Sequence, residues 1–369
     1  MKTKLYLFFI FFSVYTLCGR MFYPGPNAEI MRTSDNGNAS SANSIAIDSQ
    51  GNSYVAGYTS KIIEVDDEEE TIIQWTVAKY NSSGTRLWET IRNSDVKKSN
   101  TGNKGSIVVD AEGNSYVTGY TNTTDDDEGS NQLTIIKYNS NGDSQWEIVR
   151  TENIDISLGY GIAIDNQANI YVSGYTTKNG RVQWLITKYN NEQDLQWETI
   201  IDSAQISRAY SVTIDSAGNS YVAGFTPKAD DDDETAQLTV IKYNSSGVQQ
   251  WETIRTSDTD NDSLANSIAI DTQGNLYVAG YTQKYEYNKK WTVSKYNNAG
   301  VQQWETIRTS DTDNDSLANS ITIDAQGNLY VAGYTQKAYD TTTAQLSSCI
   351  ISFLCISSNI KIALCIYCY

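Results

Sequence analysis

The sequence predicts an all-β fold of about six four-stranded antiparallel sheets, and three observations lead to that prediction. A motif of the form Asp-x-x-Gly-Asn, followed by a Tyr-Val strand, occurs six times at intervals of 62, 55, 50, 56 and 53 residues. Each interval contains four short segments rich in Tyr, Val, Ile, Thr and Trp, which favour strands. No segment shows the periodicity of an amphipathic helix. Repeats of this length with four strands each are typical of the blades of a beta-propeller.

The four strands of a repeat come in a fixed order. A short strand such as SIAID leads through a tight turn into NSYVAGYT, then into WTVAKYN or LTIIKYN, and a turn such as NSSG precedes QQWETIR. In addition, residues 28–48 parallel residues 251–271, so an outer strand around Ile30 to Arg32 precedes the first full repeat. We expect this strand to lie beside the last copy and close the ring, because closure leaves only short, protected strand edges.

The repeat core AIDxxGNxYVAGYT, followed by KYNSSGxxxW, resembles the bacterial beta-propeller repeat family known as seven-bladed or SBBP-type repeats. The same core is more loosely similar to the NHL propeller repeat. The resemblance extends over about residues 28–346, in which six copies can be counted. It implies the fold and an exported address, and it implies no defined activity.

The two ends of the chain differ from the repeated body. Residues 1–20 combine Lys2 and Lys4 with a short apolar run, which is typical of a signal peptide, and Cys18 could be the acylated cysteine of a lipoprotein. We assign residues 21–346 to the propeller. Residues 347–369 form an apolar, cysteine-rich tail that could be a membrane anchor, a substitute third strand through CIISF, or an out-of-frame translation. We favour the last interpretation, because the repeat pattern breaks in mid-strand.

The aspartate of each motif ends a first strand just before a tight turn. Its carboxylate can accept hydrogen bonds from turn amides, so we interpret it as structural rather than catalytic. The glycine that comes after it supplies a positive φ, and in the third copy we expect Asn169 to adopt that conformation in place of Ala168. The six motif aspartates are Asp48, Asp110, Asp165, Asp215, Asp271 and Asp324.

Two further residue types recur once per repeat or nearly so. A glycine inside the second strand indicates a close backbone approach, which we attribute to crowding toward the propeller axis. A tryptophan in the outer strand is interpreted as packing between blades rather than binding a sugar. The glycines are Gly57, Gly119, Gly174, Gly224, Gly280 and Gly333, and the tryptophans are Trp88, Trp146, Trp197, Trp251 and Trp304.

Composition excludes several classes of function. The 369 residues contain no histidine, which rules out Ser-His-Asp and Cys-His catalysis and imidazole-bound zinc. The formal net charge of -17 disfavours nucleic acid and anionic membranes, which select Lys and Arg, and favours basic partners or cations. We expect a monomer that meets a membrane only through a lipid on Cys18.

The irregular parts of the repeats are acidic connections, all expected at the same edge of the sheets, after the second or the fourth strand. We predict a binding surface there, formed by Asp66, Asp67, Asp125, Asp126, Asp127, Asp230, Asp231, Asp232 and Asp233. Two connections have the alternating carboxylates of calcium loops, although the glycine and the terminal glutamate of an EF-hand are missing. The candidate calcium ligands are Asp258, Asp260, Asp262, Asp311, Asp313 and Asp315.

The leading functional hypothesis is an exported or cell-surface module that binds a protein or glycan through this acidic edge, without cofactor and without catalysis. A calcium-stabilised structural protein and a carboxylate-based hydrolase or lyase at the channel mouth are the alternatives. Between residues 248–284 and 301–337, 35 of 37 positions are identical, so whole repeats have been duplicated. Duplication multiplies a binding surface, whereas a single catalytic constellation gains nothing from it.

Overall fold

The computed structural model describes most of the repeated body of the chain. The described residues are 40–65, 68–92, 99–100, 106–122, 131–151, 156–203, 205–228, 235–255, 262–283, 289–307, 315–336, 349–356 and 363–365. They divide into two compact units, Met1–Ile164 with Thr176–Asn179 and Asp165–Tyr175 with Gly180–Tyr369. The candidate ring-closing strand and Cys18 lie outside the described residues.

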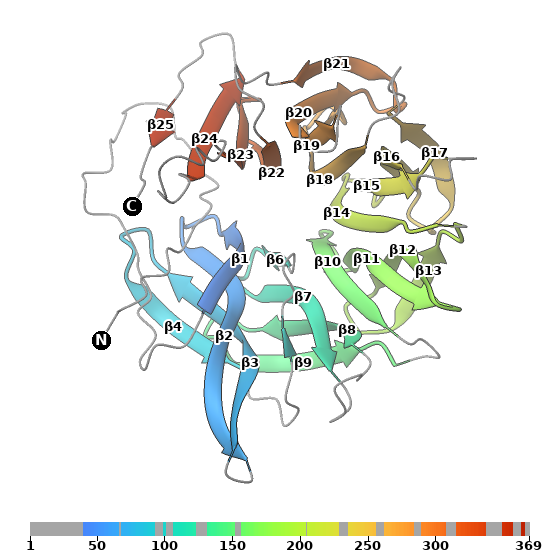
Figure 1. Cartoon of the computed structure of the whole chain (residues 1–369). Coiled ribbons are helices and arrows are strands. Elements are labelled where there is room, and N and C mark those ends of the chain that lie inside the picture. The colour runs from blue at the N-terminus through green and yellow to red at the C-terminus, as the bar shows by residue number, and fades with distance from the viewer. Residues whose placement is uncertain are drawn as a thin grey trace, which may run out of the picture. The chain divides into compact units, whose positions relative to one another are not determined.

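The described residues form six antiparallel sheets, whose strands are in chain order (Figure 1). The first sheet contains β1 (Ser40–Ile47), β2 (Ser53–Val65), β3 (Glu68–Tyr80) and β4 (Arg86–Ile91). The second contains β5 (Ser99–Asn100), β6 (Ser106–Val109), β7 (Ser115–Asn122), β8 (Asn131–Tyr138) and β9 (Ser144–Val149), with β5 and β6 both paired to β7. The third contains β10 (Ser157–Ile164), β11 (Ile170–Lys178), β12 (Arg181–Tyr189) and β13 (Leu195–Ile200).

The remaining three sheets repeat the same order. The fourth contains β14 (Arg208–Ile214), β15 (Ser220–Pro227), β16 (Ala236–Tyr243) and β17 (Gln249–Ile254). The fifth contains β18 (Ser263–Ile270), β19 (Leu276–Gln283), β20 (Lys289–Tyr296) and β21 (Gln302–Ile307). The sixth contains β22 (Ser316–Ile323), β23 (Leu329–Gln336), β24 (Cys349–Ile356) and β25 (Ala363–Cys365). The predicted all-β class with four-stranded repeats is confirmed.

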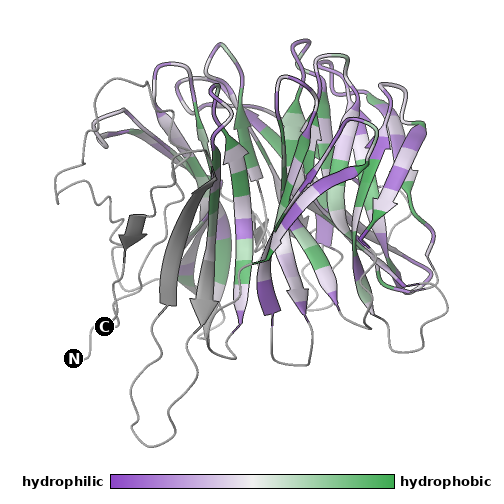
Figure 2. Ribbon diagram, turned by 90° about the horizontal axis from the view of Figure 1, so that it is seen from above, coloured by the Kyte–Doolittle hydropathy of each residue, from purple (hydrophilic) through white to green (hydrophobic). Residues whose placement is uncertain are grey.

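Apolar residues concentrate along the strands, and hydrophilic residues concentrate in the connections (Figure 2). Within each unit the core lies between successive sheets: Tyr54 and Val77 of the first sheet pack with Val117 and Ile136 of the second. In the other unit, Val240 of the fourth sheet belongs to a cluster with residues of the fifth. Both alternating sets of strand positions are apolar because successive sheets pack face to face. Among the described residues there is no helix long and apolar enough to cross a lipid bilayer.

The second-strand glycines are required by a bulge in the first strand of the same sheet. The register between β18 and β19 shifts between Ala265 and Ser267, and a Cβ added at Gly280 would collide with the carbonyl oxygen of Leu264. The same arrangement occurs at Gly57, Gly224 and Gly333. The predicted close backbone approach is confirmed, but the attribution to axial crowding was wrong, because the neighbouring strand's bulge makes the contact.

The tight turn after the first strand needs one residue with a positive φ. Glycine takes this position in five repeats, for example Gly218 with φ 77°, but in the third repeat Ala168 itself has φ 58°. The expectation that Asn169 would adopt this conformation was wrong. The reason is the position in the turn: the N–H of Ala168 donates to the Asp165 carbonyl oxygen at 2.9 Å, as the glycine N–H does elsewhere.

We expect Ala168→Gly to raise the free energy of unfolding by about 1 kcal/mol, because a left-handed φ costs alanine energy that glycine does not lose. Urea denaturation followed by tryptophan fluorescence measures the change. Ala217→Gly, one residue before the positive-φ position of the fourth sheet, is the control and should lower stability. A loss of stability in Ala168→Gly would contradict the assignment of strain to this residue.

Two hairpins at equivalent places in the first and third sheets differ in length. β11 and β12 are joined by Asn179 and Gly180, both with positive φ, which is the signature of a two-residue hairpin turn. β2 and β3 are 13 residues each and stay paired from Ser53↔Tyr80 out to Val65↔Glu68. The first sheet therefore carries an extended two-stranded arm, residues 60–73, that the third sheet lacks (Figure 1).

The tail contributes strands to the sixth sheet. β24 pairs with β23 from Leu329↔Ile356 to Gln336↔Cys349, and β25 pairs with β24. Residues 349–356 thus lie where the other repeats have their third strand, as one of the three interpretations of the tail expected. The domain boundary at residue 346 stays a prediction.

Candidate functional site

Most of the predicted acidic site lies outside the described residues. This holds for Asp66, Asp67, Asp125, Asp126, Asp127, Asp230, Asp231, Asp232, Asp233, Asp258, Asp260, Asp311 and Asp313. Their positions in the chain put them in connections that come after second or fourth strands. Antiparallel pairing brings those connections to the same edge of each sheet, which is called the insertion edge. The opposite edge, which carries the tight turns after the first strands, is called the turn edge.

The two described members of the candidate calcium loops have a structural contact. Oδ1 of Asp262 accepts a hydrogen bond from the backbone N–H of Ala236 at 2.8 Å, and Oδ1 of Asp315 accepts one from Lys289 at 2.9 Å. Each aspartate thereby joins the start of one sheet to the third strand of the sheet before it. The described residues contain no group of three or more His, Cys, Asp or Glu that could hold a metal ion. Calcium binding stays a prediction.

The motif aspartate at the turn edge is the centre of a hydrogen-bond network, here called the Asp turn. In the fourth sheet, Oδ1 of Asp215 accepts from the N–H groups of Ala217 and Asn219, each at 3.0 Å. Oδ2 of Asp215 accepts from Asn219 Nδ2 at 2.8 Å and from the Tyr221 hydroxyl at 3.0 Å. Equivalent bonds form around Asp48, Asp110, Asp165, Asp271 and Asp324. The structural interpretation of these aspartates is confirmed.

These contacts determine the ionisation of the Asp turn. Burial alone would raise the pKa of Asp215, but hydrogen bonds from Asn219, Tyr221 and Ala217 outweigh it, and the pKa lies below its ordinary value. Burial, together with the hydrogen bond to the charged Asp215, raises the pKa of Tyr221. At neutral pH the pair is therefore a carboxylate and a neutral phenol, and neither is poised for proton transfer.

A lysine that sequence reasoning left without a role completes the Asp turn. The Lys242 ammonium lies 4.9 Å from the centre of the Tyr221 ring. The centres of the Tyr221 and Trp251 rings are 6.1 Å apart. The same lysine position is occupied in four other sheets by Lys79, Lys137, Lys188 and Lys295. The signal was available in the recurring Lys-Tyr-Asn segment, since a cation beside an aromatic ring is a known stabilising pair.

The outer-strand tryptophans connect successive sheets. Nε1 of Trp88 donates to the Ser140 carbonyl at 2.9 Å, that of Trp197 to Ser245 at 3.0 Å, and that of Trp251 to Asn298 at 3.0 Å. Their rings also cover the turn glycines of the next sheet, such as Gly300. For these three residues the interpretation as packing between blades is confirmed.

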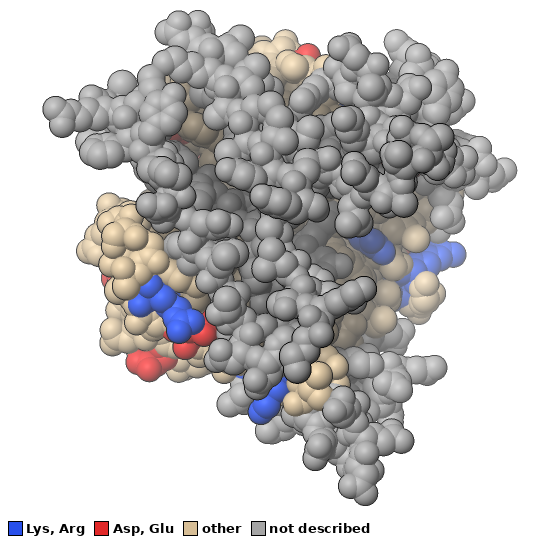
Figure 3. All heavy atoms as spheres, turned by 60° about the vertical axis from the view of Figure 1, so that its left-hand side comes forward, with Lys and Arg blue, Asp and Glu red and all other residues tan. Residues whose placement is uncertain are grey.

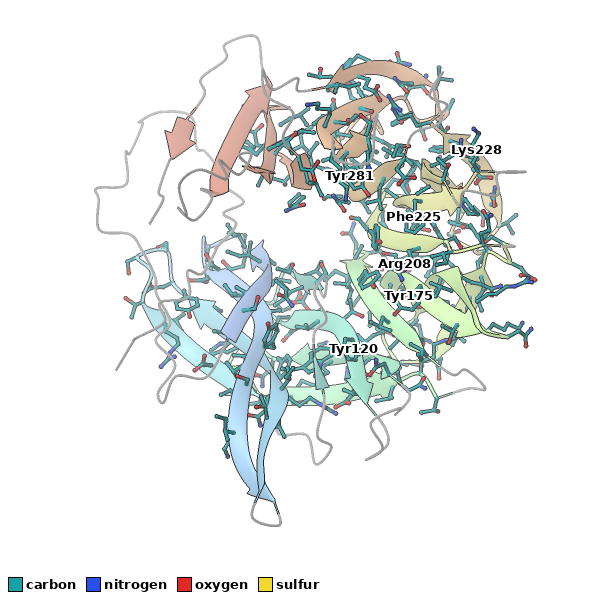
Figure 4. All side chains as sticks on the ribbon, in the orientation of Figure 1. Tyr120, Tyr175, Arg208, Phe225, Lys228 and Tyr281 are labelled. Carbon is teal, nitrogen blue, oxygen red and sulfur yellow. The ribbon has the colours of Figure 1, made fainter. Side chains whose placement is uncertain are left out.

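At the insertion edge, the end of the second strand carries an aromatic residue. Figure 4 labels four of them, Tyr120, Tyr175, Phe225 and Tyr281. In the fourth sheet the first-strand residue paired with this aromatic position is Arg208, whereas in the fifth sheet it is Leu264. Its guanidinium lies 5.0 Å from the centre of the Tyr175 ring, and Tyr210 lies 5.9 Å from Phe225. Among the described residues, the insertion edge thus carries aromatic side chains.

Some of the charged side chains on the described surface form ion pairs between sheets. Arg92 makes a two-pronged ion pair with Glu147, at 2.7 Å and 3.1 Å, and Arg255 makes one with Glu305, at 2.7 Å and 2.8 Å. On the face shown in Figure 3, a group of Lys or Arg side chains lies directly beside Asp or Glu. The excess negative charge of the chain therefore resides mainly in the acidic connections.

A pocket at the turn edge lies between the fourth and fifth sheets, both in the second unit. Its volume is about 550 Å³, and its lining is formed by Asn219, Lys242, Gln250, Trp251, Asn298 and Ala299. Sequence reasoning did not find it, because its residues come from two repeats and most of them belong to the recurring framework.

Comparison with known proteins identifies the repeat and the fold. The beta-propeller repeat family SBBP matches residues 34–64 and 257–288, which contain the first and second strands of the first and fifth sheets. Two structures of the polysaccharide lyase PL25 ulvan lyase have TM-scores of 0.54 and 0.53, with 13% and 12% identity. Each covers 84% of this chain and 78% of the lyase. At this identity the likeness concerns the fold alone.

A third similar structure is the beta-propeller domain of the Trilobed protease from Pyrococcus furiosus, with a TM-score of 0.49 and 9% identity over 88% of this chain and 83% of that one. No curated protein sequence matches the chain. The predicted beta-propeller class is confirmed by the sheets and the repeat matches together. This chain therefore has a beta-propeller fold and contains repeats that match the SBBP family in two segments.

Proposed function

We propose that this protein is an exported binding module that captures basic partners through the acidic connections at its insertion edge. The arm of the first sheet carries the proposal, because it extends an acidic sequence beyond the sheet. Residues 62–71, at the outer end of the arm, contain six carboxylates, Glu64, Asp66, Asp67, Glu68, Glu69 and Glu70. Clustered carboxylates attract basic partners at long range and speed their association.

The contacts of the recurring polar residues in the sheets support this proposal. The motif aspartates, lysines and tryptophans make contacts within or between sheets, and the Arg–Glu pairs neutralise one another. Functional variation is therefore expected in the connections rather than in the recurring strands. Loops carried on a rigid scaffold are where proteins commonly place binding residues.

The short hairpin of the third sheet shows how the arm can be removed without disturbing the strand pairing. In the arm, Lys61 pairs with Ile72, and the corresponding residues of the third sheet, Lys178 and Arg181, flank the turn Asn179-Gly180. Replacing residues 62–71 by Asn-Gly should therefore close the hairpin in register and keep the fold. We expect this variant to bind a fluorescein-labelled oligolysine peptide at low salt at least roughly tenfold more weakly, because six of the charges that attract it are gone.

A charge-only pair of variants separates the effect of the arm from that of net charge. Asp66→Asn with Asp67→Asn removes two charges from the arm, and Glu112→Gln with Glu192→Gln removes two exposed charges at the turn edge. Only the first pair should weaken oligolysine binding. Equal effects of the two pairs, or unchanged binding after removal of the arm, would reject the proposal. Turnover of a glycan or ester by the intact chain would instead support the hydrolase or lyase alternative.

A further inference from the structure

The pocket between the fourth and fifth sheets lies at a junction where the turn after the third strand carries an asparagine, Asn298, which the third sheet also has as Asn191. The turn after the third strand reads NSSG in the first and fourth sheets and NNAG in the fifth, so Asn298 stands where Ser245 stands in the fourth sheet. Asn298 and Ala299 form one wall of the pocket, and the other wall comes from the fourth sheet. This junction therefore has a larger, amide-bearing side chain at a position that is a small hydroxyl in those two repeats.

Asn298 changes the hydrogen bonds of the neighbouring Asp turn. Its Oδ1 accepts from the Tyr221 hydroxyl at 2.9 Å and from Lys242 Nζ at 2.8 Å. At the junction of the third and fourth sheets, the equivalent tyrosine hydroxyl, that of Tyr171, instead donates to the Gly218 carbonyl at 3.1 Å. The equivalent lysine, Lys188, donates to the Ser245 carbonyl at 3.4 Å. Asn298 thus holds the ammonium of Lys242 in the lining of the pocket.

One charged side chain, Lys242, lines this pocket, and a carboxylate of opposite charge, Asp215, is hydrogen-bonded to the lining residue Asn219. Lys242 contributes one ammonium, and Asp215, whose pKa is lowered against the effect of burial by hydrogen bonds from Asn219, contributes one carboxylate. Both groups contact Tyr221: Asp215 accepts a hydrogen bond from its hydroxyl, and Lys242 lies over its ring. A strongly anionic or strongly cationic ligand therefore gains little net Coulomb energy here, and the pocket favours a neutral, hydroxyl-rich ligand.

The remaining lining suits hydroxyl groups. The amides of Asn219, Gln250 and Asn298 have hydrogen-bonding groups beyond the bonds described for them: a second N–H and the oxygen of Asn219 and of Gln250, and the NH2 group of Asn298, whose oxygen already accepts from Tyr221 and Lys242. Such groups match neighbouring hydroxyls of a sugar ring. One N–H of Gln250 is used on the Val248 carbonyl at 2.9 Å, which orients the amide. The half-buried Trp251 supplies an apolar flank against which C–H groups can pack. The volume of about 550 Å³ lies in the usual range of small-ligand pockets.

We propose that this pocket binds a neutral saccharide, with Lys242 and the three amides as hydrogen-bonding groups and Trp251 as the apolar wall. Trp251 would then contact a sugar in addition to packing against the next sheet, a role that the sequence did not lead us to expect. The proposal is independent of the acidic insertion edge, because the pocket lies at the turn edge of its sheets. Saccharide binding would give the protein a second contact surface of different chemistry: a pocket with one ammonium and three amides instead of an acidic, projecting arm.

The experiment titrates the intact chain with cellotriose, maltotriose, mannotriose and chitotriose, and follows the indole N–H signals of the tryptophans by NMR. We expect at least one trisaccharide to bind at millimolar concentration and to shift the signal of Trp251, assigned by its loss in Trp251→Phe. Gln250→Ala and Lys242→Met should each weaken binding by roughly tenfold, as expected for one lost hydrogen bond to a charged or well-oriented group.

The third sheet provides matched controls. Gln196→Ala removes an exposed glutamine with the same bond, from Nε2 to the Asp194 carbonyl at 3.2 Å, and Lys188→Met removes the equivalent lysine. These variants carry the same structural cost and should leave binding unchanged. Equal losses in both sheets, or binding of none of the four trisaccharides, would each overturn the proposal.

Discussion

Gly280→Ala is expected to lower the free energy of unfolding by about 4 kcal/mol or more. Of the substitutions proposed for this chain, it should have the largest effect on stability. The added Cβ would collide with the carbonyl oxygen of Leu264 and lie about 3 Å from Ala265 Cα, both backbone atoms of the bulged first strand. Backbone cannot rotate away as a side chain can, so β18 and β19 would have to separate. Urea denaturation followed by tryptophan fluorescence measures the loss.

Gly327→Ala is the control for this substitution. Gly327 has φ 82°, and among the described residues other than its two chain neighbours no heavy atom lies within 4 Å of the position its Cβ would take. Its replacement therefore adds only the cost of a left-handed conformation, about 1 kcal/mol. If Gly280→Ala were no more harmful than Gly327→Ala, the bulge would not be the reason for glycine in the second strand.

Asp215→Ala is expected to lower the free energy of unfolding by about 3 kcal/mol, because four donors lose an ionised acceptor at once. Two of them are turn N–H groups, one is the amide of Asn219, and one is the hydroxyl of the buried Tyr221. Glu252→Ala, an exposed carboxylate on β17 of the same sheet, is the control and should change stability by about 0.5 kcal/mol or less.

The Asp turns also predict a dependence of stability on pH. Although burial acts in the opposite direction, hydrogen bonds lower the pKa of Asp48, Asp215, Asp271 and Asp324 in the folded chain. The unfolded chain then binds protons more readily than the folded one. The stability contributed by these carboxylates is complete above the ordinary carboxyl pKa and is lost as the pH falls through and below it.

We therefore expect the free energy of unfolding to be nearly constant between about pH 6 and pH 8 and to fall below about pH 4. Asp215→Ala should fall less steeply, because it has lost one of the responsible groups. A stability that stays flat down to about pH 3, or an equally steep fall in Asp215→Ala, would show that the Asp turns do not carry the acid sensitivity.

The local parts of the fold were predictable because they depend on short-range chemistry that repeats. Six copies of one motif indicated the strands, the tight turns, the structural aspartates and the packing tryptophans. The error at Ala168 arose because turn position, and not residue preference, decides which residue takes the positive φ. The reason for glycine in the second strand was missed because a bulge is a shift in register. The register between two strands cannot be inferred from the sequence of one strand alone.

The candidate sites were less predictable for the same physical reason. The acidic edge could be proposed from composition and connection length. The pocket at Asn298, the cation placed over Tyr221 and the contacts of Asp262 and Asp315 each join residues of different strands or sheets. The sequence periodicity does not indicate such contacts, because they depend on how one sheet packs against the next.

By itself the sequence determined the repeat, its four strands, its turn chemistry and the absence of histidine chemistry, because each of these depends on residue type and spacing along the chain. Only the tertiary structure decided that the acidic sequence of the first repeat is carried on an arm and that Asn298 forms a pocket beside Trp251. The physical reason is that pairing register and sheet packing fix distances between residues about fifty positions apart, and a hydrogen bond or a pocket exists only where those distances are met.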